Sequence, residues 1–184
     1  PSDGAAQPID QHPKGSALTV DDGGIRDVCA DNLEEEFALM CNVMDEYNYV
    51  AIDTEFPGIV LEPFAEHIDS ISTWNYAQLR DNVNALKLIQ LGISFSNEKG
   101  ETPKDGPCWQ FNFQFDLGQD MYASDAIDLL TNSMLNFEVT KTNGIKPEVF
   151  GEMLMSSGLV LNENIHWISF HGLYDFGYIL KVLT

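Results

Sequence analysis

From residue 25 onwards, segments with a hydrophobic residue every three or four positions, as in helices, take turns with segments of strand-like pattern. Residues 32–46 carry a hydrophobic side chain every three or four positions, which predicts an amphipathic helix. Glu34–Glu36 fall near its start, where the helix dipole favours negative charge. The segment 49–55 (YVAIDTE) has the pattern of a strand that enters the core, and Pro57-Gly58 terminates it. The ordered part of the chain therefore begins with a helix followed by a strand.

Further elements follow from the same two periods and from the turn-forming residues between them. An apolar stretch over residues 86–95 predicts a buried strand, and the alternation of aromatic and polar residues over 108–115 (CWQFNFQF) is typical of a half-buried antiparallel strand. Residues 97–107 between them are rich in turn formers. The other expected elements are helices over residues 73–84, from Ser124, over 147–157 and over 172–183, a turn at 140–144 and a strand over 165–170. This order predicts an α/β fold with a mixed sheet.

The strongly negative charge of the chain limits its possible partners. Of 184 residues, 29 are Asp or Glu and only 9 are Lys or Arg, which gives a net charge of -20. Blanket adhesion to nucleic acid or to an anionic membrane needs a basic surface, so neither a membrane nor DNA is expected as a partner. The chain also lacks the window of about 18 apolar residues that a membrane-spanning helix needs. A phosphate-bearing substrate would have to be held locally, most simply by divalent cations on carboxylates.

The composition divides the chain into a tail and one domain. Residues 1–24 are rich in Pro, Gly, Ser and Asp and are expected to form a flexible tail, while residues 25–184 suffice for one domain with a core. Its cysteines, Cys29, Cys41 and Cys108, are odd in number and form no CxxC pair, which indicates reduced structural thiols.

The acidic pair Asp53 and Glu55 is the first candidate for chemistry. The two residues are two positions apart on the predicted strand, so their side chains point to the same face, while Val50, Ile52 and Thr54 would pack inward. Neighbouring carboxylates repel each other, and a cation removes that penalty. Oxygen ligands favour Mg²⁺ or Mn²⁺ over zinc. Spacing alone favours ordinary solvated carboxylates, because D-x-E is common in an acidic protein.

Three further residues could lie near this pair. Asp175 falls at the start of a helix that directly follows a strand, where ligands often bind, although spacing alone slightly favours a surface Asp on the helix dipole. His171 lies four residues earlier and could contact a phosphate, act as a base or merely cap a turn. Phe56 is the one aromatic residue placed where a substrate base could reach it. If Asp175 is to share a cation with Asp53 and Glu55, its carboxyl group must converge on theirs.

Two segments together carry a family resemblance that spacing alone does not. YNYVAIDTEFPG (47–58) and SFHGLYDFGYILKVLT (169–184) resemble the Caf/Pop family of mRNA deadenylases, nuclease subunits of the Ccr–Not deadenylation complex. The intervening stretches 82–101, 108–130 and 151–161 are also similar to that family, in the same order. The resemblance extends from about Asn32 to Thr184 and so covers nearly all of the expected domain.

The resemblance implies a fold, a reaction and a set of ligands. The fold would be the ribonuclease-H-like mixed β-sheet flanked by helices of the DEDD exonucleases, with residues 25–184 as its N-terminal part. The reaction would be 3′–5′ exonucleolytic hydrolysis of poly(A) RNA that releases 5′-AMP. Two divalent metal ions, Mg²⁺ or Mn²⁺, would be held by Asp53 and Glu55 of the first motif and Asp175 of the second, which would be the catalytic residues. Phe56 and His171 would contact the substrate.

The resemblance also sets expectations about missing parts and partners. The family's third motif, with a fourth Asp and a nearby His, has no counterpart before Thr184, so the C-terminal part of the fold is expected to be missing and catalysis to be weak. Expected partners are a Not-type scaffold and a Ccr-type nuclease, and the expected location is the cytoplasm and also the nucleus. The alternative is a truncated, non-catalytic adaptor that binds the Not scaffold. Met155 is the candidate scaffold contact, although core packing would explain it equally well.

Overall fold

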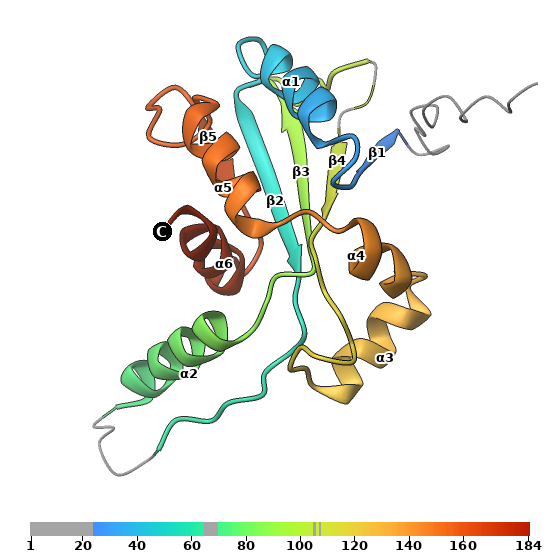
Figure 1. Ribbon diagram of the computed structural model, residues 1–184. Coiled ribbons are helices and arrows are strands. Elements are labelled where there is room, and N and C mark those ends of the chain that lie inside the picture. Colours follow the sequence, from blue (N-terminus) through green and yellow to red (C-terminus); the bar gives the residue numbers. More distant parts are fainter. Residues whose placement is uncertain (1–23, 65–69, 105, 107) are drawn as a thin grey trace, which may run out of the picture.

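A five-stranded mixed sheet forms the centre of the molecule (Figure 1). The computed structural model describes residues 24–64, 70–104, 106 and 108–184. These residues form the strands β1 (Ile25–Val28), β2 (Tyr49–Glu55), β3 (Gln90–Ser96), β4 (Cys108–Asn112) and β5 (His166–Ile168). They also form the helices α1 (Leu33–Val43), α2 (Ile71–Ala85), α3 (Ser124–Asn132), α4 (Phe137–Asn143), α5 (Pro147–Ser156) and α6 (Leu173–Leu183).

The strands lie in the order β1-β4-β3-β2-β5, with an antiparallel centre and parallel edges. β2 pairs with β3 and β3 with β4 in antiparallel fashion, whereas β1 runs parallel to β4 and β5 parallel to β2. The register places Glu55, Gln90 and Asn112 in one row across the sheet. Asp53, Gly92, Gln110 and Asp27 form the neighbouring row. The sheet is therefore mixed, as predicted.

The two faces of the sheet differ in character. One face carries the apolar residues of β2, β3 and β4, and together with α1, α5 and α6 these form the main core. Phe150 of α5 is central to it, because its ring makes edge contacts with Phe37, Phe111 and Phe113. The opposite face carries polar or small side chains that stay partly or largely exposed, Asp53, Glu55 and Gln110 among them. This polar face is where chemistry can reach solvent.

Helix α6 lies between α2 and α5, and two glycines permit the close approach. A Cβ atom at Gly151 of α5 would clash with the Val182 carbonyl oxygen on α6. A Cβ at Gly177 of α6 would meet the Val83 side chain of α2 at 3.1 Å. The close packing at these two glycines fixes where α6 meets the sheet.

An internal ion pair fastens β1 to the rest of the sheet. Glu36 of α1, 2% exposed, accepts hydrogen bonds from Arg26 of β1 at 2.6 and 3.0 Å and from the Trp109 indole of β4 at 3.1 Å. A buried carboxylate is tolerated only when it is paired and hydrogen-bonded in this way. Of the three acids near the start of α1, only Glu36 is buried, whereas Glu34 and Glu35 are exposed.

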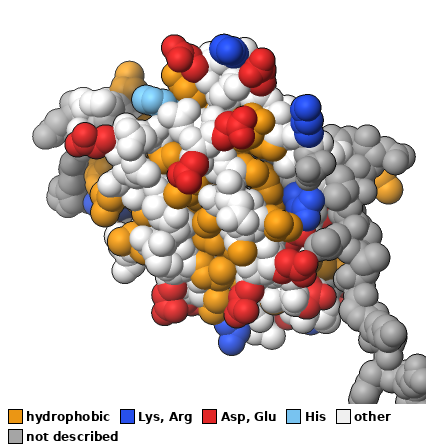
Figure 2. Space-filling view, turned by 90° about the horizontal axis from the view of Figure 1, so that it is seen from above, with side chains coloured by type: hydrophobic (Ala, Val, Ile, Leu, Met, Phe, Trp, Pro, Cys, Tyr) orange, Lys and Arg blue, Asp and Glu red, His pale blue; other side chains and the backbone are white. Residues whose placement is uncertain are grey.

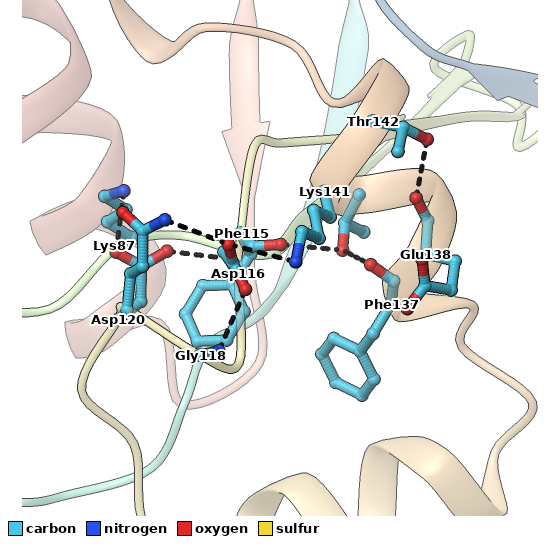
Figure 3. Close-up of polar contacts among 11 residues, drawn as sticks. Lys87, Phe115, Asp116, Gly118, Asp120, Phe137, Glu138, Lys141 and Thr142 are labelled. Carbon is cyan, nitrogen blue, oxygen red and sulfur yellow. Dashed lines mark hydrogen bonds and ion pairs between the residues drawn. The ribbon is translucent and has the colours of Figure 1, made fainter.

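A polar network beyond β4 holds α4 against the sheet (Figure 3). Asp116 accepts from the Gly118 backbone N–H at 2.8 Å and pairs with Lys141 of α4 at 3.4 Å. Asp120 pairs with Lys87, which precedes β3, at 2.7 Å. The Gly118 N–H, followed by the two lysines, lowers the pKa of Asp116. These contacts join three segments that are distant in sequence and position α4 beside the polar face.

Most of the predicted elements are confirmed, and their bounds shift by a few residues. β2 has the predicted bounds, and α1, α2, α3, α5 and α6 appear where helical periodicity placed them. The predicted strand over 86–95 begins only at Gln90, because Leu86 caps α2 through its N–H and Ile89 bonds to the Glu55 carbonyl. The strand expected over 165–170 is β5, reduced to three residues.

Two expectations about local structure are wrong. The turn predicted at 140–144 falls mostly within α4, whose first turn is capped by Asn136 and which contains two β-branched threonines that favour helix only weakly. β1 was not expected, because its four residues IRDV carry no clear alternation and it forms only through pairing with β4, far along the chain. Apart from Gly24, the predicted tail 1–24 lies outside the described residues.

The surface matches the charge of the chain. Figure 2 shows carboxylates scattered around a band of hydrophobic side chains on the end of the molecule that is uppermost in Figure 1. All three cysteines are free, as predicted. Within the described residues, none of the helices has the length and apolar character needed to cross a membrane.

Candidate active site

Asp53 and Glu55 stand side by side near the end of β2, on the polar face. Their neighbours Val50, Ile52 and Thr54 are buried on the other face, as the alternation predicted. Asp53 and Glu55 are both exposed to solvent. Across the strand pair, Asp53 faces Gly92 and Glu55 faces Gln90, so no bulky side chain of β3 covers Asp53.

Asp175 reaches the same strand from the core side. It lies in the first turn of α6, is 6% exposed, and accepts a hydrogen bond from the Thr54 hydroxyl at 2.6 Å. Thr54 is the residue between the acidic pair, and its side chain points to the face opposite theirs. The structure therefore brings all three acids to the end of β2, with Asp175 approaching from the other side of the strand.

The electrostatics of Glu55 report this proximity. Partial burial, then the charge of Asp53, then that of Asp175 raise the pKa of the Glu55 carboxyl above its ordinary value. Like charges within electrostatic range of one another disfavour ionisation, and a bound cation would relieve that cost. The three acids thus form one negative centre even though they come from two elements.

The donors suit a hard divalent cation, but the geometry is incomplete for three ligands. Carboxylate oxygens are the ligands that Mg²⁺ and Mn²⁺ prefer, and Asp53 and Glu55 present theirs to solvent on one face. Within the residues described, no group of three or more His, Cys, Asp or Glu side chains is close enough to hold a metal. The pair thus fits as cation ligands, whereas the full convergence expected of Asp175 is not reached.

The other predicted site residues lie at different distances from this centre. Phe56 is half-buried, with its ring stacked on Tyr174 at 4.9 Å and tilted against Tyr178 at 5.4 Å. His171 is exposed just before α6, in a left-handed backbone conformation (φ 54), with its ring edge-on to Phe170. Phe56 thus supports α6, and His171 is open to a ligand from solvent.

Met155 lies well away from the acids, near the end of α5. Its side chain is 49% exposed, whereas the preceding Leu154 is fully buried in the core. Met155 is therefore accessible to a partner and is not a core residue, which had been the alternative interpretation.

A group of carboxamides on the polar face was not anticipated. Gln90, Gln110 and Asn112 line a cavity of about 460 Å³ together with Glu55 and Asp27. The sequence signal lay in the alternate positions of QLGISFS and CWQFN, but only the register of the strands shows that they are neighbours. Thr54 was likewise expected only to pack inward, because its partner Asp175 lies 121 residues later.

Comparison with known families gives one match over most of the chain. The family model described as CAF1 family ribonuclease matches residues 28–146. The probable CCR4-associated factor 1 homolog 7 of Arabidopsis thaliana is 51% identical over 166 residues, which cover 87% of this chain and 60% of that protein. The poly(A) ribonuclease pop2 of Schizosaccharomyces pombe is 46% identical over 160 residues, which cover 87% of this chain and 48% of that protein.

Solved structures agree with these sequence matches. The Mg²⁺- and Mn²⁺-bound form of S. pombe Pop2p superposes with a TM-score of 0.85 at 45% identity, covering 87% of this chain and 63% of that one. The yeast CAF1 structure co-crystallized with the NOT1 MIF4G domain gives a TM-score of 0.70 at 36% identity, covering 86% and 58%. The mixed sheet with its flanking helices is thus the Pop2 fold, and the chain spans about half to two-thirds of the length of these relatives.

Replacing Thr54 tests the anchoring of Asp175. Thr54→Val keeps the size of the side chain but leaves a buried carboxylate oxygen without its donor, so the free energy of unfolding should fall by about 2 kcal/mol. Urea unfolding followed by tryptophan fluorescence measures this. Thr54→Ser, which keeps the hydroxyl, should lose less. Equal stability of Thr54→Val and the unaltered chain would contradict the anchoring role.

Replacing Glu55 tests the electrostatic cost of the acidic centre. The raised pKa means that the folded state binds the Glu55 proton more tightly than the unfolded state, so stability is lost as pH rises from the ordinary pKa through the raised one. Without added metal, Glu55→Gln should therefore raise the melting temperature at neutral pH, and the gain should vanish at about pH 3.5, below the ordinary pKa. Differential scanning calorimetry checks this. The exposed Glu98→Gln is the control and should show no gain. An unchanged melting temperature of Glu55→Gln at neutral pH would contradict an electrostatic cost at Glu55.

Proposed function

Because this chain belongs to the CAF1 ribonuclease family, we propose that it is a 3′–5′ exoribonuclease that shortens poly(A) and releases 5′-AMP. The observation that carries the proposal is the placement of Asp53 and Glu55, adjacent and accessible on the open polar face, with Asp175 anchored to the residue between them. The name of the S. pombe relative, a poly(A) ribonuclease, supports RNA with a poly(A) end as the substrate.

Two divalent cations, Mg²⁺ or Mn²⁺, belong to the same proposal. Asp53 and Glu55 would hold them, and Asp175 would join them once its carboxylate converges on theirs; the Mg²⁺- and Mn²⁺-bound form of Pop2p supports this choice of metals. When bound, such ions supply a hydroxide nucleophile and positive charge at the scissile phosphate. The oxygen-only donor set of the chain and the mutual repulsion at Glu55 favour the same kind of ion.

The chain's own residues contribute position and charge. Asp53 and Glu55 provide negative charge at a point that an extended strand of RNA can reach, because the polar face around them is partly open. The Thr54 hydroxyl fixes one oxygen of Asp175 and so sets the direction of its carboxylate. His171, which is exposed just before α6, would contact a backbone phosphate, and Phe56 supports that helix through Tyr174.

Asp53→Asn should abolish the shortening of poly(A). The variant keeps the shape of the side chain but removes a charged ligand, so the rate with a 5′-labelled oligo(A) in Mg²⁺ or Mn²⁺ should fall by about 100-fold or more. A denaturing gel that resolves single nucleotides measures the ladder. Asp45→Asn, an exposed acid after α1, should keep the full rate. Absence of metal-dependent shortening by a version that spans the full length of the relatives, or full activity of its Asp53→Asn variant, would overturn the proposal.

We further propose that the end of α5 docks on a Not-type scaffold. The yeast CAF1 co-crystallized with the NOT1 MIF4G domain supports such a partner, and Met155 offers an exposed apolar side chain. A Ccr-type nuclease as a second partner, and residence in the cytoplasm and also the nucleus, belong to the same proposal and follow from membership of the family.

Met155→Arg should release the scaffold without unfolding the chain. A charged group at a contact that must lose its water should weaken binding to a purified MIF4G domain of the NOT1 type by about 10-fold or more, because leaving a buried charge unpaired is costly. The melting temperature should stay unchanged, since the Met155 side chain is half-exposed. Ser156→Arg, the exposed neighbour, serves as the control. Unfolding of Met155→Arg, or unchanged binding, would exclude this surface.

A further inference from the structure

A directed chain of hydrogen bonds crosses the polar face beside the acidic pair. Gln90 donates through its NH₂ group to the Asn112 carboxamide oxygen at 2.6 Å, and Asn112 donates through its own NH₂ group to Asp27 at 2.7 Å. Gln110 also donates to the same Asp27 oxygen, at 3.3 Å. Two carboxamides of β4 thus point their amino groups at one carboxylate, and the amino group of Gln90 on β3 points at the oxygen of Asn112.

Asp27 sets the polarity of this chain. An ionised carboxylate only accepts hydrogen bonds, so the amides that face it must present their NH₂ groups to it and turn their oxygens away. Asn112, 5% exposed, is locked in this orientation and therefore offers its oxygen to Gln90. In the described part of the chain, no hydrogen bond uses the carboxamide oxygen of Gln90 or Gln110. Two oriented acceptors are thus left on the face that carries Glu55.

The surrounding space suits one nucleotide. The cavity that these side chains line with Glu55 has a volume of about 460 Å³, within the usual range for small-molecule sites. Gly92 separates Gln110 from Asp53 in the same row, and a Cβ atom there would meet nothing closer than the Asp53 carbonyl oxygen at 3.7 Å, so the space above it is open. Two strand spacings, about 10 Å, separate β2 from β4, a span comparable to that from phosphate to base edge.

We propose that this cavity binds the base of the nucleotide being removed and selects bases that carry an exocyclic amino group. The amino group of adenine would donate to the free oxygens of Gln90 and Gln110. A carbonyl group at the same position is itself an acceptor, so its oxygen would be repelled by theirs. Met134, 90% exposed at the rim, adds a polarisable apolar surface for the ring. This inference rests on the proposed function, since it places the reacting phosphate at Asp53 and Glu55.

A matched pair of ligands tests the selection. Adenosine and inosine differ in the group at carbon 6, an amino group in the first and a carbonyl in the second, and neither carries a phosphate that the bare acidic centre would repel. Titrated into the ¹⁵N-labelled chain in EDTA, adenosine should bind about fivefold or more tightly than inosine, the value of one hydrogen bond, and should shift the side-chain NH₂ signals of Gln90 and Gln110. Equal affinities, no binding of adenosine at millimolar concentration, or unmoved glutamine signals would each overturn the inference.

A variant pair assigns the effect to the carboxamides. Gln110→Met should bring the affinities for adenosine and inosine to within about twofold of each other, while Ser94→Ala, on the same face of β3 but outside the cavity lining, should keep the preference. A preference that survives in Gln110→Met would exclude Gln110 as the reader. Because these measurements use neither metal nor hydrolysis, loss of the base preference leaves the nuclease proposal standing, and loss of oligo(A) shortening leaves the base preference standing.

Discussion

The hydrogen bond from Thr54 to Asp175 is the constraint on which the candidate site depends. It joins the end of β2 to the first turn of α6, two elements separated by most of the chain. Because a strand alternates its faces, the single residue between the two outward acids is the one that points inward. The D-x-E spacing therefore does two tasks: it places two carboxylates on the open face and leaves an inner position from which a hydroxyl can hold a third.

The acidic centre carries an electrostatic cost that the rest of the fold offsets. Crowding raises the pKa of Glu55, whereas the carboxylates with structural roles are each matched to donors. Glu36 is buried against Arg26 and Trp109, and Asp116 is held by a backbone N–H and Lys141. The chain has few Lys and Arg residues, and it uses several of them to pair with its own carboxylates. Strain of this kind is typical of functional sites, where a ligand is needed to relieve it.

Local patterns predicted much of the fold, and long-range pairing accounts for the rest. β2 and α6 were found because alternation and helical spacing are visible within a few residues. β1 was missed because the segment IRDV forms a strand only by pairing with β4. α4 was missed because its threonines favour helix only weakly and the helix is short. The resemblance located Asp53, Glu55 and Asp175, but not that Asp175 meets Thr54. Gln90 and Gln110 became neighbours of the acids only through the register of the sheet, which a single sequence does not display.

The contrast between the antiparallel centre and the parallel edges of the sheet bears on how the molecule assembles. β3 and β4 are joined by a short connection, and β2 is joined to β3 through α2, whereas β5 must return to β2 from more than a hundred residues away. Closing long loops is slow, so we expect the antiparallel centre to form first and β5 and α6 to dock after it. Asp53 and Glu55 would then lie in place on β2 before α6 brings Asp175, so the acidic centre is assembled in two stages.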